Sequence, residues 1–485
     1  MTMPSLSPAA PSGSEDSPAR ARRPGPVFWA IALGVLARLA LLPFVPLVMD
    51  EAYYVDWGRN LQPGYLDHPP AVGWLVAVPL RLLGDSPLAL RLPALLLQTL
   101  ALVLAASLVR ARAGERAALA VVLGIQAAPL FSAGGALIVP DAPLTLAWVG
   151  TFWGLQRAVD RGPRWFLAAG LFLGLGVLSK LTAGLLGVAV LAGLLATRDG
   201  RRLLATPWPW LGAALALAVA SPMLLWNAAH GWPSFTFQAS HGLSGRTFSI
   251  VRLLASLGGQ LAYVSPVLLV LAAGAAWRAL RARGDALGAA LAFSALPVAA
   301  FFTLAAALTP NALPHWPAPA WLSALLLLCL AGAAAGRRWR VALGVGFASI
   351  GAALLTVLFF LAVPVPLARG PLDDLLGWRE GARAARAVAG DARLAVGHWM
   401  HLGQLGLYDG RSPAYVGARV SGPTFYDPAP LAAGEPLLVV TVDRQGPQRA
   451  ALEKRLGPLE PAGSFEARQG ERLVRTYRFW WWRGR

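Results

Sequence analysis

Long apolar runs separated by short polar loops dominate the pattern of this chain. A run of about 20 apolar residues is long enough to cross a bilayer as a helix. We place eleven such runs, at 27–48, 89–109, 117–138, 143–157, 165–179, 181–197, 208–226, 253–276, 286–308, 317–336 and 341–363. The pattern therefore predicts an all-α polytopic membrane protein with about eleven transmembrane helices.

The loops between these runs alternate in charge. Arginines follow the second, fourth, sixth, eighth and tenth runs, at 110, 112, 116, 157, 161, 164, 198, 201, 202, 278, 281, 283, 337, 338 and 340. The tail before the first run is also basic, with Arg20, Arg22 and Arg23. Because positively charged loops stay on the cytoplasmic side, we expect a cytoplasmic N-terminus and an external C-terminus.

The segments outside the apolar runs divide the chain into parts. Residues 1–26 are rich in Pro, Ser and Ala and are predicted to be a disordered cytoplasmic tail. Residues 27–365 form the membrane domain, with a first external loop at about 49–88, in which 71–83 reads as an interfacial helix. Residues 366–485 are predicted to be a small external α/β domain, with a helix at 378–388, strands at 436–442 and 473–479, and a final aromatic run, 479–482, that is either a last strand or an interfacial belt.

Composition supports a membrane protein and argues against a nucleic-acid partner. Only 14% of the residues are charged, the mean hydropathy is +0.55, and the net charge is +18. The arginines lie in short clusters between apolar runs, without the interleaved aromatics of a single-strand binding groove. The chain has one cysteine, Cys329, so an intrachain disulfide and a cysteine-based metal site are excluded.

Most chemically versatile side chains fall in the loops expected to be external. The first loop carries Asp50, Glu51, Tyr65, Asp67 and His68, and later loops carry Asp141 and Lys180. Ionisable groups at a helix mouth are costly and usually functional. A carboxylate such as Asp50 can take a proton from an attacking hydroxyl or amine. Basic groups can bind a phosphate, and the candidates are Arg59, His68, Arg81, Arg91 and Lys180.

Structural roles remain open for the same residues. Asp50 could be the N-cap of a helix beginning near Ala52, and Glu51 could fill that role instead. Asp141 could begin the fourth helix, with Pro143 in its first turn. The tyrosines of the first loop could be interfacial anchors, and Asp67-His68-Pro69-Pro70 a rigid terminator. His398 and His401, three residues apart, lack a nearby acidic partner for a zinc site.

These motifs resemble those of a known family. Asp50-Glu51-Ala52-Tyr53-Tyr54, Gly64 to Pro70 and Arg91-Leu92-Pro93 resemble the first external loop of GT-C glycosyltransferases, in the branch of protein O-mannosyltransferases and lipid A aminoarabinose transferases. Pro140 to Leu144 resembles the second acidic loop of that group, and Leu178 to Thr182 another recurrent segment. The aminoarabinose transferases carry Glu-Lys where this chain has Asp67-His68, and His-Pro-Pro is closer to the mannosyltransferase pattern.

The resemblance implies inverting transfer of a sugar from a polyprenyl-phosphate donor to an external lipopolysaccharide component, glycan or protein. It implies that Asp50 is the general base and Asp141 a second catalytic carboxylate. We expect substrate or donor-phosphate contacts from Glu51, Arg59, Tyr65, Asp67, His68, Arg91 and Lys180. No metal ligands are assigned, although a divalent metal is left open as a cofactor. The expected location is a bacterial inner membrane with a periplasmic active site, and the alternative is a transporter or flippase of a lipid-linked or anionic solute.

Overall fold

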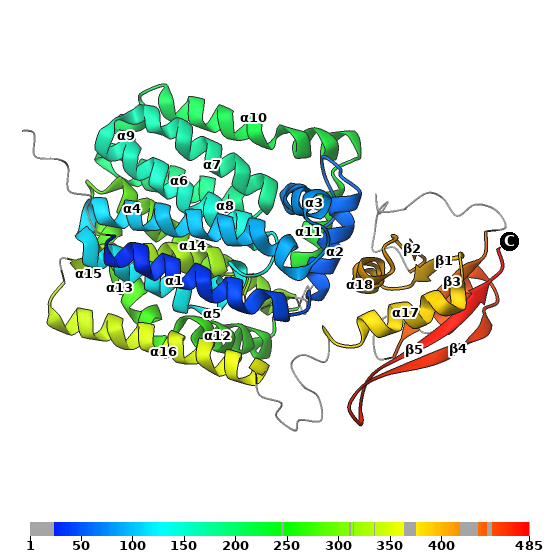
Figure 1. Cartoon of the computed structure of the whole chain (residues 1–485). Coiled ribbons are helices and arrows are strands. Elements are labelled where there is room, and N and C mark those ends of the chain that lie inside the picture. The colour runs from blue at the N-terminus through cyan, green and yellow to red at the C-terminus, as the bar shows by residue number, and fades with distance from the viewer. Residues whose placement is uncertain are drawn as a thin grey trace, which may run out of the picture.

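The computed structural model describes residues 24–484, except 244–246, 310–311, 314, 334, 363–374, 418–434 and 444–448. A bundle of helices lies at one end of the molecule and a small α/β domain at the other (Figure 1). This arrangement confirms a mostly helical membrane domain followed by a C-terminal domain with a sheet. Residues 1–23 of the tail predicted at 1–26, and the expected boundary at 365–366, lie outside the described residues.

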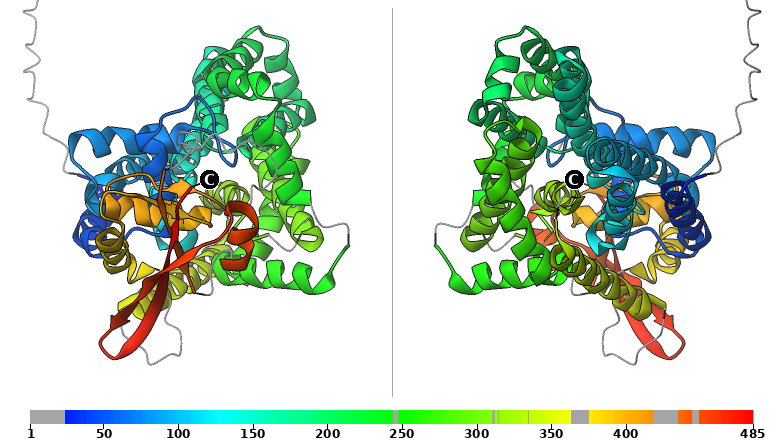
Figure 2. Two further views of the ribbon diagram at one scale, coloured as in Figure 1. Left: turned by 90° about the vertical axis from the view of Figure 1, so that its right-hand side faces the viewer. Right: turned by 90° about the vertical axis from the view of Figure 1, so that its left-hand side faces the viewer.

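Long helices form the bundle. Their bounds are α1 Pro26–Leu41, α4 Pro87–Ala127, α6 Asp141–Arg161, α7 Phe166–Ser179, α8 Ala183–Ala196, α10 Trp208–Ala229, α12 Ile250–Val264, α13 Pro266–Arg281, α14 Ala286–Leu308, α15 Ala318–Ala333 and α16 Arg337–Ala362. The short helices between them are η1 Leu42–Phe44, α2 Met49–Arg59, α3 Ala71–Leu82, α5 Pro129–Gly134, η2 Pro163–Trp165, α9 Arg198–Leu204 and α11 Pro233–Leu243. In the end-on views of Figure 2, the green helices around α10 lie on one side of the bundle and the blue helices α1 and α4 on the other.

Fewer helices qualify as membrane spans than the eleven predicted. Within the described residues, five helices are long and apolar enough to cross a membrane, or seven if two bent helix pairs each count as one span. The number eleven therefore stays a prediction. The helix expected at 71–83 is present as α3, which lies with α2 at the end of the bundle facing the C-terminal domain (Figure 1).

Two predicted runs are not single straight helices. The run at 117–138 breaks between α4 and α5, where Ala128 is extended with ψ of 120°. The break arises because Pro129 disfavours helical geometry in the residue before it. The run at 253–276 bends by 93° between α12 and α13, at Ser265, whose φ is +76°. The long α4 also turns, at Gly114, where φ is +80°.

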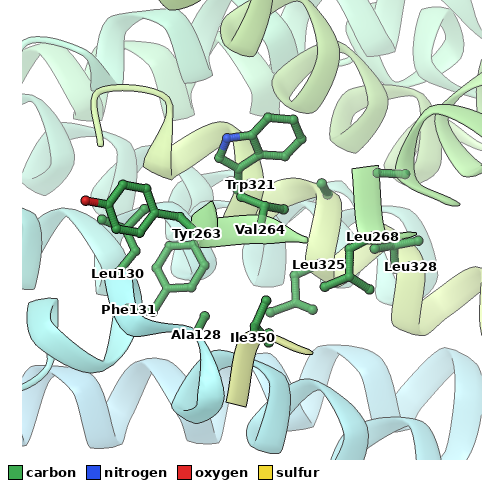
Figure 3. Close-up of a pocket in the computed structure, with 12 residues that line it drawn as sticks. Ala128, Leu130, Phe131, Tyr263, Val264, Leu268, Trp321, Leu325, Leu328 and Ile350 are labelled. Carbon is green, nitrogen blue, oxygen red and sulfur yellow. The ribbon is translucent and has the colours of Figure 1, made fainter. Parts of the chain in front are cut away.

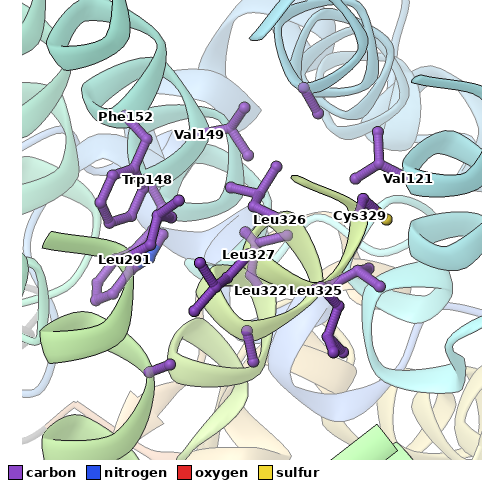
Figure 4. Close-up of a cluster of buried hydrophobic side chains, with 14 of the residues drawn as sticks. Val121, Trp148, Val149, Phe152, Leu291, Leu322, Leu325, Leu326, Leu327 and Cys329 are labelled. Carbon is purple, nitrogen blue, oxygen red and sulfur yellow. The ribbon is translucent and has the colours of Figure 1, made fainter. Parts of the chain in front are cut away.

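The core of the bundle is built around α15. Leucines of this helix pack against Trp148 and Phe152 of α6 and Leu291 of α14 (Figure 4). The indole of Trp148 donates to the Ser323 hydroxyl at 2.8 Å, so the polar atom of this buried ring is paired. Cys329 lies in the same cluster and is 2% exposed, which fits a packing role.

The C-terminal domain contains a five-stranded mixed sheet in the order β2-β1-β3-β5-β4. The strands are β1 Arg393–Val396, β2 Ala414–Tyr415, β3 Leu437–Val442, β4 Glu460–Gln469 and β5 Arg472–Trp482, and the helices are α17 Trp378–Ala389, α18 Trp399–Asp409 and α19 Arg449–Leu456. The helix and both strands expected here are confirmed. The final aromatic run is the end of β5, where Trp482 pairs with Leu437 and is 9% exposed, so it belongs to the domain core.

Basic loops meet at the end of the bundle away from this domain. Arg112, beside the turn in α4, pairs with Asp160 of α6 at 2.5 Å and with Asp285 at 3.5 Å. The backbone N–H of Arg198 donates to the carbonyl of Arg283 at 2.9 Å. Loops separated by 48 to 173 residues are therefore joined on one side, as their shared charge led us to expect.

Candidate active site

Asp50 lies in the first turn of α2, with its side chain exposed. The N-cap position is occupied by Val48, and Oε2 of Glu51 accepts a hydrogen bond from the Val48 N–H at 3.0 Å. Glu51 thus satisfies a free N–H at the helix start, as carboxylates in the first turn commonly do. Asp50 is left without a capping role, and its carboxylate is available for chemistry.

Glu51 and Arg91 form a buried ion pair, and each is 0% exposed. Arg91 Nε and Nη2 donate to the Glu51 carboxylate at 2.8 and 2.5 Å. The remaining guanidinium N–H groups donate to the carbonyls of Leu42, Val45 and Pro46. All five donors of the guanidinium are used, so Arg91 has none left for a phosphate. Its contacts are those of a structural brace, and the expected contact with the donor phosphate stays a prediction.

The same brace connects Asp50 to Asp141. Glu51 Oε1 also accepts a hydrogen bond from the backbone N–H of Ile138 at 3.0 Å. Ile138 is three residues before Asp141, and Glu51 is the residue after Asp50. The ion pair therefore holds the backbone next to both candidate catalytic carboxylates.

Asp141 begins α6, with Pro143 in its first turn, and it pairs with Lys180 directly after α7. Lys180 Nζ lies 3.0 Å from each carboxylate oxygen. Burial acts to raise the pKa of Asp141, but Lys180, with smaller contributions from His315 and His68, outweighs it and lowers the pKa. Asp141 is thus held as an anion beside a cation that is still partly exposed.

Asp50 is close enough to interact electrostatically with Asp141 and Lys180. The pKa of Asp50 is raised, first by loss of hydration, then by the negative charges of Glu51 and Asp141, and Lys180 opposes the shift. Asp50 keeps solvent access, but the surrounding protein still displaces enough water to disfavour its charged form. A raised pKa makes a carboxylate a stronger base, which suits proton abstraction.

Asp67 and His68 reach the same cluster from the loop between α2 and α3. Burial raises the pKa of Asp67 to about 7, although the Tyr53 hydroxyl hydrogen bonds to its carboxylate, and the charge of Asp50 adds to the shift. The Gln238 side chain donates to the carbonyl of Asp67, which ties this loop to α11. The ring of His68 lies 6.4 Å from that of Tyr54.

His315 is a site residue that the sequence pattern did not single out. It lies between α14 and α15, interacts electrostatically with Asp141 and Lys180, and its pKa is lowered, chiefly by burial. Its position in an expected external loop was the available signal, but a lone histidine there is more often structural.

Tyr65 and Arg59, both expected to bind substrate, have structural contacts. Tyr65 stacks on Trp57 with ring centroids 3.7 Å apart and is 1% exposed. Its hydroxyl donates to the Asn60 carbonyl at 2.9 Å and accepts from the Gln62 N–H at 3.0 Å, which fixes the loop after α2. Arg59 lies at the far end of α2 from Asp50, roughly 13.5 Å away along the helix axis at 1.5 Å per residue.

An apolar pocket lies elsewhere in the bundle (Figure 3). Side chains of α5, α12, α13, α15 and α16 line it, among them Phe131, Tyr263, Leu268, Trp321 and Ile350. Its volume of about 20 Å³ is close to the minimum for a single water. No charged side chain lines this pocket, so it does not contribute to the carboxylate cluster.

The cluster combines three carboxylates (Asp50, Asp67 and Asp141), one lysine and two histidines at one end of the bundle. Such a set can remove a proton from a nucleophile and stabilise the negative charge of a phosphate leaving group. Among the described residues, no three His, Cys, Asp or Glu side chains are grouped as metal ligands would be.

Comparison with known proteins gives three kinds of match. The family model described as dolichyl-phosphate-mannose-protein mannosyltransferase matches residues 67–226. The lipid A galacturonosyltransferase RgtD of Rhizobium johnstonii is 25% identical over 321 residues, which cover 61% of this chain and 63% of that protein. The chain thus spans less than two thirds of the length of this relative.

Solved structures share the fold at lower identity. ArnT from Cupriavidus metallidurans superposes with a TM-score of 0.67 over 93% of this chain and 97% of ArnT, at 17% identity in the apo state and 19% when bound to undecaprenyl phosphate. The archaeal oligosaccharyltransferase AglB from Archaeoglobus fulgidus, in complex with an inhibitory peptide and a dolichol-phosphate, has a TM-score of 0.51 at 12% identity, over 80% of this chain and 64% of AglB. These matches confirm the GT-C fold that the motifs indicated, and residues 67–226 are similar to the protein mannosyltransferase family.

Proposed function

We propose that this protein transfers a sugar from a polyprenyl-phosphate donor to an extracytoplasmic acceptor, with inversion at the anomeric carbon. The observation that carries the proposal is the convergence of Asp50, Asp67-His68 and the Asp141–Lys180 pair, from separate segments, at one end of the bundle. A carboxylate base beside a partly exposed lysine supplies both groups that such a transfer needs.

The proposed reaction is a single displacement. Asp50 takes the proton of an acceptor hydroxyl while the hydroxyl oxygen forms a bond to the anomeric carbon. The bond between that carbon and the phosphate oxygen breaks, and its electron pair leaves with the polyprenyl phosphate. Attack opposite the leaving group inverts the anomeric configuration.

The leaving phosphate gains a negative charge, and Lys180 and His68 are the proposed groups that stabilise it. Lys180 is already paired with Asp141, so it is oriented before the donor arrives. Preorganised charge stabilises a transition state without reorganisation during the reaction. Asp141 then acts by holding Lys180 and by raising the pKa of its neighbour Asp50, which makes the Asp50 carboxylate a stronger base.

The relatives suggest the substrates. The matched galacturonosyltransferase acts on lipid A, and ArnT has been captured with undecaprenyl phosphate. We propose an undecaprenyl-phosphate-linked sugar as the donor and lipid A as the first acceptor to test, with glycans and proteins as the alternatives. Galacturonic acid is the first sugar to test.

We also propose that the site faces the periplasm of a bacterial inner membrane. The paired arginine loops at the opposite end of the bundle support this orientation, because basic loops favour the cytoplasmic side. The C-terminal domain would then be periplasmic.

The test is transfer of labelled sugar from undecaprenyl-phosphate galacturonic acid to lipid A by the purified full-length protein. Asp50→Asn should lower the rate at least about a hundredfold, the scale of lost general-base catalysis. Asp85→Asn is the matched control, since Asp85 is an exposed carboxylate in the same loop. Transfer at the wild-type rate in folded Asp50→Asn protein would refute the assignment. Solute uptake into proteoliposomes without donor lipid would favour the transporter alternative.

A further inference from the structure

The helix that carries Asp50 is in contact with the C-terminal domain along its length. Gln404 of α18 donates to the carbonyl of Leu47, just before α2, at 3.1 Å. At the other end of α2, Arg59 donates to the carbonyl of Gly406 at 2.8 Å, and the Ser412 hydroxyl hydrogen bonds to the Asp56 carboxylate. The two helices are therefore connected near both ends of α2 (Figure 1).

Between these hydrogen bonds, the backbones of α18 and α2 touch. A Cβ atom on Gly403 would lie 2.4 Å from the Tyr53 nitrogen and 2.5 Å from the Ala52 carbonyl carbon. Both atoms belong to the backbone of α2, so no side-chain rotation could make room. Only glycine at 403 permits this spacing.

Side chains continue the contact on both sides of Asp50. Met49, the residue before it, packs against the core of the C-terminal domain. Leu407 of α18 is buried in the cluster that contains Ala52 and Val55 of α2. The ring of Tyr53 meets that of Trp399 edge-on, with centroids 5.0 Å apart.

A helix as short as α2 depends on such contacts. It has 11 residues, and isolated helices of fewer than about 12–15 residues are marginal in water. The Glu51–Arg91 pair anchors α2 to the bundle on one side, and α18 covers it on the other. Without α18, the first turn of α2 would lose its packing at Met49 and the hydrogen bond at Leu47.

We propose that the C-terminal domain positions the catalytic base. Gly403 and Gln404 of α18 hold the backbone on either side of Asp50, at Tyr53 and Leu47, and thereby set where its carboxylate meets the acceptor. The inference rests on the proposed role of Asp50. It makes Gly403 and Gln404 positioning residues of the transfer reaction, although both belong to a domain outside the membrane bundle.

The consequence is a defined kinetic effect. Gly403→Ala must move α18 away from α2 by roughly 1 Å, because ordinary contacts with a Cβ start near 3.4 Å. A displacement of that size at a catalytic group costs on the order of a hundredfold in rate. The donor phosphate is bound by other segments, so the turnover number should fall about 10- to 100-fold while the KM for the donor lipid changes little.

Gly381→Ala is the matched control. Its Cβ would lie 2.1 Å from the Tyr477 ring, a comparable clash inside the same domain but away from α2. A milder pair is Gln404→Ala, which removes one interface hydrogen bond, with Gln469→Ala, at the last residue of β4, as its control. Each interface variant should lower the turnover number, and neither control should.

A second readout is independent of transfer. The native cysteine is first removed by Cys329→Ser. Spin labels are then attached to Asp50→Cys, on α2, and to Leu96→Cys, at an exposed position of α4, and they report the distance between α2 and the bundle. Gly403→Ala should broaden or shift this distance, and Gly381→Ala should not. If the wild-type protein transfers no sugar, the proposed function is refuted. The label distances would still show whether α18 of the C-terminal domain holds α2 in place. Unchanged turnover and distance in folded Gly403→Ala protein, or equal effects from Gly381→Ala, would overturn the inference.

Discussion

Glu51 and Arg91 are joined by two hydrogen bonds, of 2.8 and 2.5 Å, in a position fully shielded from solvent. They lie 40 residues apart in the chain. The pair lies between the two catalytic candidates: Glu51 follows Asp50 in the chain and also accepts a hydrogen bond from the backbone N–H of Ile138, three residues before Asp141. Its role in the molecule is to hold the site together.

Loss of one partner should therefore destabilise the protein. Arg91→Met leaves the Glu51 carboxylate buried without a counter-charge, and breaking such a pair costs about 3–5 kcal/mol. We expect a lower midpoint of thermal unfolding in detergent, with Arg81→Met, an exposed arginine of the same loop, as the unaffected control. If Arg91→Met kept its stability and instead weakened undecaprenyl phosphate binding, Arg91 would be a donor ligand.

Lys180→Met should weaken catalysis without unfolding the protein. Lys180 and its partner Asp141 are both partly exposed, so removing the lysine leaves no fully buried charge without a partner. The leaving phosphate, however, loses the cation that stabilises it. A charge-assisted hydrogen bond contributes about 1.5–3 kcal/mol, equivalent to about a 10- to 100-fold fall in kcat/KM. Lys454, on α19, is the other lysine of the chain and is exposed. Lys454→Met is the matched control, and an equal loss in both variants would contradict the role of Lys180.

The pH dependence of transfer should report Asp50. Its pKa is raised by lost hydration and by the charges of Glu51 and Asp141, so kcat/KM should rise with pH through a midpoint above the usual aspartate range. Asp141→Asn removes one negative neighbour and should move that midpoint down. Lys180→Met removes the opposing positive charge and should move it up. Midpoints that shift in the same direction in both variants would show that another group controls the rate.

Stability should depend on pH through Asp67. Its pKa is about 7 in the folded protein, chiefly because of burial, and about 3.9 in an unfolded chain. Between these values the folded state retains the proton and the unfolded state does not, so stability falls as the pH rises from about 4 to 7. Asp67→Asn should abolish that decline, and thermal unfolding at about pH 5 and pH 8 would measure it. The control variant Asp85→Asn should show the same fall in stability as the wild type. If Asp67→Asn also showed a fall of wild-type size, Asp67 would be excluded as its source.

Local sequence determined much of this architecture. Apolar runs predict membrane helices because length and composition alone decide whether a segment suits a bilayer. The α/β character of the C-terminal domain and the helix at 71–83 followed from such local signals, whereas the GT-C fold was implied by the resemblance of the loop motifs to a known family. So did the gathering of Asp50, Asp141 and Lys180, since each lies in a loop assigned to the same side.

The hydropathy pattern failed to predict two helix breaks, because a single residue changed the direction of the backbone without changing the hydropathy of the run. Pro129 interrupts an apolar run without altering its hydropathy, and the bend at Ser265 lies inside another run. Both segments looked continuous because hydropathy averages over residues and does not register backbone direction.

Only the tertiary structure separated the polar groups that are consumed by internal contacts from those that stay accessible to a substrate. In the sequence, Glu51 and Arg91 are site candidates alongside Asp50 and Lys180, since all are ionisable residues near a helix mouth. Arg91 finds all five of its hydrogen-bond acceptors in the folded chain, whereas Asp50 remains exposed. The contact of Gly403 with α2 is likewise invisible in the sequence, because about 350 residues separate them. Contacts between residues so far apart in the chain depend on how the helices pack in three dimensions, and the spacing of residues along the sequence does not predict them.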